Sequence, residues 1–417
     1  MRTITAYIFL IIVTHSLAFS QKNLSLDDCE SIFRQNNLLL LAEQYNIKIA
    51  NANVIQAKIW ELPVVSVELN AINPQDNRVF DIGEQGQKSF AIQQLIYLGK
   101  KKKKEVDFAK STISIAELQF EQLLRNLRYQ LHYSFYTIYF EQQKVKGIET
   151  QIANIDTLIK AYSVQAQKRN ISMKDVVRLQ SISIDLKNNL ISFQKNIYQE
   201  QENLKILTGL SESINPIIED FSFLNLYSQK LVPETEFLLK TSLEINPEYL
   251  SFLKIIDSQE LMLKWQKSLA TPDITAGISY DQRGGAFGNQ INLTLGIPIP
   301  LWNRNKGNIQ VSEAQIAQSK LLKDQKKLEL ESQIANAYKT WHLQKDQYNQ
   351  IGLTINENFN EVLEGVLKNF KRQNITILEF TDFMESYNLS ILQLNEMKKQ
   401  LILSSESLNH IVNTNLF

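Results

Sequence analysis

Residues 169–177, RNISMKDVV, recur about 200 residues later in the chain as QNITILEFT at residues 373–381. Two further pairs align upstream in the same order. YLGK at 97–100 matches LWNRNKG at 301–307, and Pro63 matches Pro272, each opening a strand-like stretch after a helical one. A repeat of this length predicts one structural unit written twice along the chain.

Each copy reads as a helix, a strand, a loop, a second strand, a very long helix, a tight turn and a long returning helix. We expect the first repeat at residues 21–208, with its turn at about 169–175. The second repeat is expected at residues 234–417, with its turn at about 373–379. Residues 209–233 form the linker, because Gly209, Pro216 and Pro233 interrupt the helical pattern there.

Four segments have the two-residue alternation of a strand with one apolar and one polar face. The alternation is clearest in QINLTLGI at 290–297 and weaker where Gln93 and Gln94 are adjacent. The strand lengths approach the ~9–11 residues that cross a bilayer. Soluble hairpins packed on helices are the alternative interpretation. The expected strands are 64–72, 88–97, 273–282 and 289–299.

Four strands cannot close into a barrel, and lipid does not tolerate an open sheet edge. A membrane interpretation therefore requires oligomerisation. Three chains would supply about twelve strands, which is within the range of membrane barrels.

The segments between the strands and the turns predict long helices. Residues 99–169 contain no Pro and one internal Gly, Gly147. A helix of ~70 residues would be ~105 Å long. Apolar residues recur at steps of three and four, as an antiparallel coiled coil requires. The fold class predicted is α+β, mostly α, with long antiparallel coiled-coil helical hairpins forming an α-barrel and four strands per chain contributing to a twelve-stranded trimeric membrane β-barrel.

The first 20 residues are typical of a secretory signal peptide. Arg2 supplies the positive start, residues 7–13 are apolar, and Ala18-Phe19-Ser20 ends the segment. An uncleaved anchor is the alternative, although its apolar core is shorter than the ~20 residues of a spanning helix. The single cysteine, Cys29, is interpreted as a buried helix residue rather than a lipid anchor.

Several classes of function are disfavoured. The 44 basic and 44 acidic side chains balance, which gives no electrostatic footprint for nucleic acid. The four histidines are isolated, and no nucleophile–base motif, phosphate loop or paired carboxylates occur. We therefore predict no catalytic residue, no cofactor and no metal site, and not an enzyme. The basic run Lys100–Lys104 is either a solvated helix start or a set of side chains that snorkel at the inner lipid boundary.

The duplication, the element order and the turn motif resemble the TolC-like outer-membrane efflux family, the outer membrane factors, over essentially the whole mature chain. In that family the turn begins with Gly, which is replaced here by Arg169 and Gln373. We therefore expect Asn170 and Asn374 to carry the left-handed turn. Ser172 and Thr376 are expected to be N-caps, with Asp175 and Glu379 completing capping boxes.

Residues 296–307, GIPIPLWNRNKG, are similar to the strand-to-helix corner of the heavy-metal-cation efflux branch. Proline at a strand end and glycine at a helix start suit these positions. The similarity favours metal cations over drugs or type I secretion substrates. The expected strand-to-helix corner residues are Gly99, Pro298, Pro300 and Gly307.

The resemblance implies a passive homotrimeric duct in the outer membrane of a Gram-negative bacterium, extending into the periplasm. Its implied partners are outer-membrane lipid, a periplasmic adaptor (membrane fusion) protein and an inner-membrane pump, with the resistance-nodulation-division type favoured. The alternatives are a periplasmic or secreted coiled-coil scaffold without a pore and a trimeric coiled-coil adhesin.

The resemblance also assigns roles to residues near the two turns. Acids at these positions would line the periplasmic aperture, and capping their own helices is the alternative role of Asp175 and Glu379. The implied aperture residues are Glu379, Asp382 and Asp175. The implied adaptor-contacting tips are Arg169, Asn170, Ile171, Ser172, Gln373, Asn374, Ile375 and Thr376.

Overall fold

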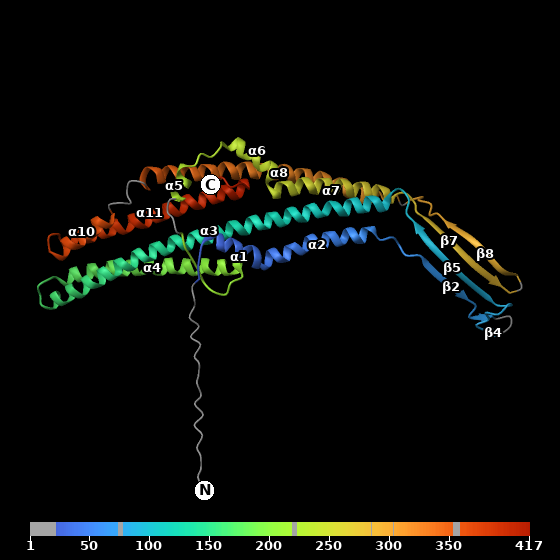
Figure 1. Cartoon of the computed structure of the whole chain (residues 1–417), viewed down its shortest axis with the longest axis horizontal. Coiled ribbons are helices and arrows are strands. Elements are labelled where there is room, and N and C mark those ends of the chain that lie inside the picture. The colour runs from blue at the N-terminus through green and yellow to red at the C-terminus, as the bar shows by residue number, and fades with distance from the viewer. Residues whose placement is uncertain (1–21, 74–77, 219–222, 285, 303, 353–358) are drawn as a thin grey trace, which may run out of the picture. The chain divides into compact units, whose positions relative to one another are not determined.

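The structure is a computed structural model of the 417-residue chain (Figure 1). The expected signal peptide, residues 1–20, lies outside the described residues. Part of the expected linker, residues 219–222, does so as well. The described residues are 22–73, 78–218, 223–284, 286–302, 304–352 and 359–417.

The chain divides into two compact units, and each unit combines segments from both halves of the sequence. The helical unit contains the described residues up to Leu41, Leu124–Leu239 and Gln333–Phe417. The sheet unit contains Ala42–Leu123 and Lys240–Ser332. The boundaries of the two compact units therefore do not coincide with those of the two predicted sequence repeats, because each unit contains residues from both repeats.

The sheet unit holds one antiparallel sheet in the order β2-β5-β7-β8 (Figure 1). Its central pair joins β5 to β7 and hence one sequence repeat to the other. A short ribbon of β3 (Ile72–Asn73) and β4 (Arg78–Val79) lies in the loop between β2 and β5. The four main strands are β2 (Val64–Leu69), β5 (Gln87–Ile96), β7 (Ile274–Arg283) and β8 (Phe287–Gly296).

Two strands end earlier than the alternation predicts. β2 ends at Leu69 rather than at residue 72, because Ile72 turns into β3 and pairs with Val79. β8 ends at Gly296 rather than at residue 299. Pro298 has no backbone N–H, so the ladder cannot continue through it.

The helices of the sheet unit pack through small and aromatic side chains. Val54, Ala57 and Ala109 form a buried cluster, and the Phe108 ring stacks on the Trp265 ring with centroids 5.9 Å apart. Asn246 caps the N-terminus of α7, where Pro247 has no N–H to leave unpaired. The helices wholly or partly in this unit are α2 (Leu38–Lys58), α3 (Lys101–Gln167), α6 (Thr235–Ile245), α7 (Pro247–Leu269) and α8 (Lys306–Gln347).

The helix α3 has 67 residues, so it is about 100 Å long. The predicted long helix of the first repeat is therefore confirmed. In the second repeat, α8 ends at Gln347 and a π-helical turn, η1 (Tyr348–Gly352), follows it. The sequence did not predict this interruption. None of the helices among the described residues is both long enough and apolar enough to cross a membrane.

The remaining helices belong to the helical unit. Leu131, Ile138 and Leu186, all on the predicted apolar stripes, are buried, and Cys29 is buried in α1 as expected. The short strands β1 (Lys22–Leu24) and β6 (Ile214–Pro216) pair in parallel. The helices are α1 (Leu26–Asn36), α4 (Met173–Thr208), α5 (Phe223–Gln229), α10 (Phe359–Lys371) and α11 (Ile377–Val412).

Candidate functional site

One face of the four-stranded sheet is apolar and exposed. Because residues paired across an antiparallel ladder share a face, the register places apolar side chains in rows that cross all four strands. One row is Val67, Phe90, Tyr280 and Ile291, and the next is Val65, Ile92, Ile278 and Leu293. Leu293 is 83% exposed. A face of this size without a covering layer requires an apolar environment or a partner.

The opposite face of the sheet is polar. Ser66, Ser279 and Asn292 lie in the row between those two apolar rows, and Thr294 lies in the row after Leu293. The two faces of the sheet therefore differ in polarity, one apolar and the other polar. This arrangement suits a wall between lipid and water.

Both outer strands of the sheet have a free edge within the described residues. The strand β2 pairs with β5 on one side, and β8 pairs with β7 on one side. Almost every residue of β2 and β8 is exposed. An exposed strand edge is a template for pairing with another strand.

The turns that end the two helical hairpins differ from the prediction in one respect. The left-handed residues are Arg169 (φ 62°) and Gln373 (φ 64°), so the prediction that Asn170 and Asn374 carry the turn is wrong. The reason is the hydrogen-bond pattern at the helix end. The N–H of Asn170 donates to the Gln165 carbonyl at 3.0 Å, which fixes the residue before it in the left-handed region.

The two asparagine side chains brace the turns in place of adopting the left-handed conformation. Nδ2 of Asn170 donates to Oε1 of Gln165 at 2.8 Å. Nδ2 of Asn374 donates to Oδ1 of Asn369 at 3.3 Å. Arg169 and Gln373 thus accept a backbone conformation that costs about 1–2 kcal/mol for a residue other than Gly.

The predicted N-caps are present, but only one of the two predicted capping boxes is closed. Thr376 and Glu379 form the full box, and the backbone N–H and hydroxyl of Thr376 hold the pKa of Glu379 below its usual value. In the other turn, the Ser172 hydroxyl accepts the Lys174 N–H at 3.2 Å. The Asp175 N–H donates to the Ser172 carbonyl instead, so Asp175 closes no box.

The three predicted aperture acids have different surroundings. Glu379 and Asp382 are exposed, three residues apart on α11, whereas Asp175 is half-buried on α4. Glu379 is already engaged as a helix cap. Asp382 is therefore the acid of the three that is exposed and free of a capping role.

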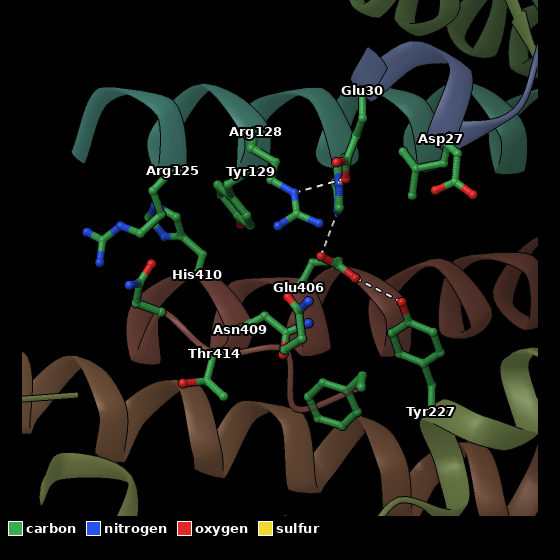
Figure 2. A pocket seen from close by; sticks show the side chains of 15 residues that line it. Asp27, Glu30, Arg125, Arg128, Tyr129, Tyr227, Glu406, Asn409, His410 and Thr414 are labelled. Carbon is green, nitrogen blue, oxygen red and sulfur yellow. Dashed lines mark hydrogen bonds and ion pairs between the residues drawn. The ribbon is translucent and has the colours of Figure 1, made fainter. Parts of the chain in front are cut away.

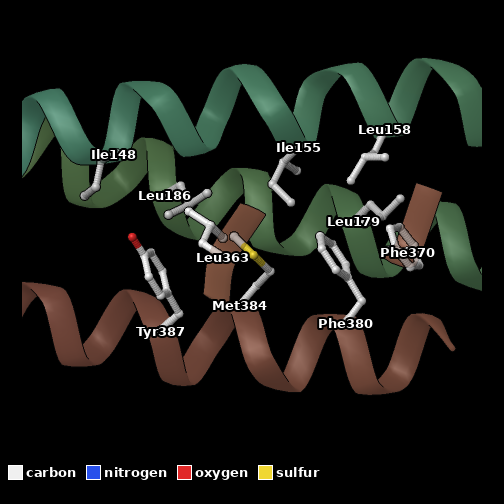
Figure 3. Close-up of a cluster of buried hydrophobic side chains, with 10 residues drawn as sticks. All are labelled: Ile148, Ile155, Leu158, Leu179, Leu186, Leu363, Phe370, Phe380, Met384 and Tyr387. Atoms are coloured by element: carbon white, nitrogen blue, oxygen red, sulfur yellow. The ribbon is translucent and has the colours of Figure 1, made fainter. Parts of the chain in front are cut away.

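The ends of the two hairpins are joined by a buried apolar cluster, with residues from α3, α4, α10 and α11 (Figure 3). The Tyr162 and Phe370 rings stack with centroids 5.4 Å apart, and the Phe370 and Phe380 rings stack at 4.0 Å. The predicted tip residues thus stand on one shared core. The buried members are Ile148, Ile155, Leu158, Leu179, Leu186, Leu363, Phe370, Phe380, Met384 and Tyr387.

A buried ionic network in the helical unit was not predicted from the sequence (Figure 2). His132 lies between two carboxylates, with Nε2 2.5 Å from Oε1 of Glu30 and Nδ1 2.8 Å from Oε2 of Glu406. Nε of Arg128 donates to Glu30 at 2.9 Å, and the Tyr227 hydroxyl donates to Glu406 at 2.8 Å. The network ties α1, α3, α5 and α11 together.

The charges of this network explain its pKa values. Burial alone would lower the pKa of His132, but the bonds to Glu30 and Glu406 outweigh it and raise the pKa to about 9. Burial would raise the pKa of Glu30, yet His132 and Arg128 lower it to about 2. His132 is therefore an imidazolium at neutral pH, and both of its ring nitrogens are occupied.

The sequence predicted His132 to be isolated. Its partners lie 102 and 274 residues away, so no local spacing reveals them. One signal was present: Arg128 and His132 occur one helical turn apart, each directly after a residue of the apolar stripe, Leu127 and Leu131. Among the described residues, no group of three or more His, Cys, Asp or Glu side chains could hold a metal ion.

The predicted strand-to-helix corners have left-handed backbone. Gly99 has φ 66° and Lys100 φ 58°, directly before α3; Asn305 has φ 58°, directly before α8. Nζ of Lys101 lies 2.6 Å from Oδ1 of Asp273, which also accepts the Leu98 N–H. Within the basic run Lys100–Lys104, Lys101 therefore holds the corner in place through its ion pair with Asp273.

The other corner residues flank the start of α8. Pro298 and Pro300 follow the end of β8, and Gly307 lies in the first turn of α8. The side chain of Asn305 holds this corner by donating to the Gln266 carbonyl at 2.8 Å.

Comparisons with known proteins agree with this geometry. No family model matches the chain. The cobalt-zinc-cadmium resistance protein CzcC of Cupriavidus metallidurans is 22% identical over 304 residues, which is 72% of this chain and 69% of CzcC.

Solved structures match the fold over almost the whole chain. The crystal structure of CusC, described in connection with transmembrane channel formation, aligns with TM-score 0.74 and 15% identity over 93% of this chain and 92% of CusC. The CmeC outer membrane channel of Campylobacter jejuni aligns with TM-score 0.73 and 11% identity over 94% of this chain and 86% of CmeC.

The four-stranded sheet and the long helical hairpins match the fold of these solved structures. The predicted α+β fold with long hairpins and four main strands is confirmed. The chain is thus similar in sequence to CzcC and in fold to CusC and CmeC.

Proposed function

We propose that this chain is the outer-membrane duct of a tripartite efflux system and works as a homotrimer. The observation that carries the proposal is the sheet, whose exposed apolar face and polar face extend across all four strands. Lipid provides the apolar environment that this face requires. The protein is thus located in the outer membrane.

The two free sheet edges support a trimer. In lipid, unpaired backbone groups on β2 and β8 would each cost several kcal/mol. Pairing β8 of one copy with β2 of the next removes both edges at every junction. Three copies give a closed sheet of about twelve strands, which leaves a water-filled interior lined by the polar face.

The helical hairpins are proposed to continue the duct into the periplasm. Their turns, around Arg169 and Gln373, are proposed to contact the hairpin of a periplasmic adaptor that connects to an inner-membrane pump. Both turns are exposed and stand on the cluster that contains Phe370 and Phe380. The duct itself is passive and has no enzymatic activity; the pump supplies the energy.

Metal cations are the proposed substrates. Support comes from the sequence match to a cobalt-zinc-cadmium resistance protein and from the corner sequence at 296–307. A duct does not need to bind its substrate tightly, so the proposal requires no metal site in this chain. A drug-exporting duct would have the same fold and is the second candidate.

Asp382 is the proposed aperture acid. A trimer repeats each residue three times around one axis, so three exposed carboxylates would form a ring. Such a ring favours cations and repels itself, which assists opening. Glu379 and Asp175 are proposed to contribute to the same ring, Glu379 also as the cap of α11.

Two experiments test the proposal. After a high-salt wash, the protein should remain with outer membranes; release by salt would favour a periplasmic scaffold. Deletion of the gene should then lower survival on Zn, Co, Cd, Cu or Ag ions, with bile salts and dyes as comparison. Sensitivity to bile salts and dyes alone would replace the metal substrate by drugs and leave the duct in place.

A further inference from the structure

The two hairpin ends of the helical unit differ in charge although they are equivalent in the sequence repeat. The first hairpin end, residues 160–178, has five basic side chains and one acidic one, which is a surplus of four positive charges. The second hairpin end, residues 364–382, has three of each and is balanced. The two ends therefore present different charges to a partner. The charged residues of the first hairpin end are Lys160, Lys168, Arg169, Lys174, Asp175 and Arg178.

The positive charges of the first hairpin end are open to a partner. Lys168, Arg169 and Lys174 are exposed. Among the described residues, none of these three cations forms an ion pair. The one acid of this end, Asp175, is half-buried. A trimer would bring three such surpluses to one end of the assembly, which is unfavourable unless an acidic partner offsets them.

Apolar side chains are exposed beside these charges. Met173 is 61% and Val177 51% exposed, and the two lie one turn apart on α4. Lys174 and Arg178 form a second row, also one turn apart and next to the first. Protein interfaces combine such side chains, since Met and Arg are enriched in them. An apolar row beside a basic row on one helix fits a partner helix with an apolar row and an acidic row.

The second hairpin end lacks this combination. In place of the apolar row, Ile377 packs against the buried cluster that both hairpin ends share (Figure 3), and Thr381 is polar. In place of the basic row, Leu378 and Asp382 replace the two cations. Because the second end is balanced in charge, the second end of a neighbouring copy supplies no surplus of acid to the first. The complement of the first end must therefore come from another protein.

We propose that the first hairpin end selects the adaptor by charge, and that it takes an adaptor hairpin whose end carries a surplus of Asp and Glu beside apolar side chains. The inference rests on the proposed function, in which both turns contact the adaptor, and gives the two turns different roles. Opposite charge speeds the encounter with this partner and disfavours basic ones. The buried cluster below the surface holds it in place, which lowers the ordering cost of binding.

Photo-crosslinking in living cells tests the proposal. The photoreactive amino acid p-benzoylphenylalanine replaces Lys168 in one full-length variant and the equivalent Arg372 in another. After irradiation, the cross-linked segment of the partner is sequenced by mass spectrometry. We expect a roughly threefold higher yield of protein adduct at position 168, with a partner segment that has more Asp and Glu than Lys and Arg. A partner segment without this surplus, an adduct between two copies of this chain, or equal yields at the two positions would overturn the proposal.

Charge reversal gives an independent test. The double variant Lys168→Glu/Lys174→Glu reverses two exposed charges on the first hairpin end, and Lys371→Glu/Arg372→Glu reverses two exposed charges on the second as the matched control. Each variant replaces the wild type in cells grown on a compound to which the deletion strain is sensitive. We expect the first variant to lower the viable count about tenfold and the control to keep it within about twofold of the wild type. An equal loss in both would contradict the proposal.

Two further measurements separate failure of the inference from failure of the proposed function. Both double variants should still form trimers and give current steps in a planar bilayer, and Lys168→Gln/Lys174→Gln, which adds no acid, should lower the viable count by a smaller factor. If the first variant conducts and its cells survive like the wild type, charge selection is wrong and the duct stands. If the wild type gives no current steps, or neither cross-linking position gives a protein adduct, the duct or its adaptor contact is wrong too.

Discussion

The ring of Tyr162 on α3 stacks on the ring of Phe370 on α10, with centroids 5.4 Å apart, and so joins the turn regions of the two sequence repeats. Phe370 is 2% exposed and also stacks on Phe380 of α11. The two hairpin ends therefore share one buried core.

Phe370→Ala should loosen both tips. Loss of a buried aromatic ring costs roughly 3–5 kcal/mol, and here the cost falls on the local cluster. Hydrogen exchange near Arg169 and Gln373 should accelerate, and proteases should cut there first. Met173→Ala is the matched control, because Met173 is 61% exposed beside the same turn. Equal exchange in the two variants would show that the cluster does not hold the tips.

His132→Gln should destabilise the helical unit by about 3 kcal/mol at pH 6, because it leaves two buried carboxylates without their shared cation. The pKa of His132 is raised, so its contribution is complete below the unfolded pKa of 6.5 and is lost as the pH rises through about 9. Thermal unfolding of the wild type and the variant should therefore differ most at pH 6 and converge above pH 9.

The contribution of Glu30 to stability depends on pH in the opposite direction to that of His132. The pKa of Glu30 is lowered to about 2, so its contribution is present above its unfolded value and is lost as the pH falls through about 2. His342→Gln is the control, because His342 is exposed and forms an ion pair with Asp346 on its own helix. If His342→Gln destabilised the protein as much as His132→Gln, the stabilising role assigned to the buried network of His132 would be refuted.

Lys101→Ala should weaken the strand-to-helix corner by about 3 kcal/mol, because Asp273 would remain without its cation while it still accepts the Leu98 N–H. Lys103→Ala, two residues away and exposed, should change stability by less than about 0.5 kcal/mol. Chemical denaturation of the detergent-solubilised protein measures both. Similar midpoints for the two variants would mean that the pair contributes nothing.

Asp382→Lys should reduce the preference for cations, because it would replace three proposed negative charges at the aperture by positive ones. Single-channel recordings under a salt gradient measure the preference as a reversal potential. Asp382→Glu, which keeps the charge, should leave the potential unchanged. An Asp382→Lys channel with the selectivity of the wild type would remove Asp382 from the aperture.

The sequence predicted the strands best where apolar and polar residues alternate without interruption. In β8, Ile291, Leu293 and Leu295 alternate with polar residues, and the structure confirms a strand with that apolar face. The long helix α3 was predictable for a similar reason. Apolar residues recur at steps of three and four, and the segment contains no Pro and one Gly, Gly147, which costs only about 1 kcal/mol in a helix interior.

Other features could not be predicted because they depend on distant or local geometry that composition does not show. Glu30, His132 and Glu406 meet only after three helices have packed together. The left-handed conformation of Arg169 depends on its place after the last helical residue, which overrides the ordinary preference of Asn for that region. The π-helical turn η1 has no period of its own in the sequence.

The central claim, that copies of this chain assemble into a duct through the outer membrane, is tested most directly by conductance. Purified full-length protein is added to a planar phospholipid bilayer. The account predicts stepwise current increases of one uniform size, from particles that contain three chains by light scattering. A protein that inserts stably into vesicles yet gives no current steps, or that remains a monomer, would contradict the account.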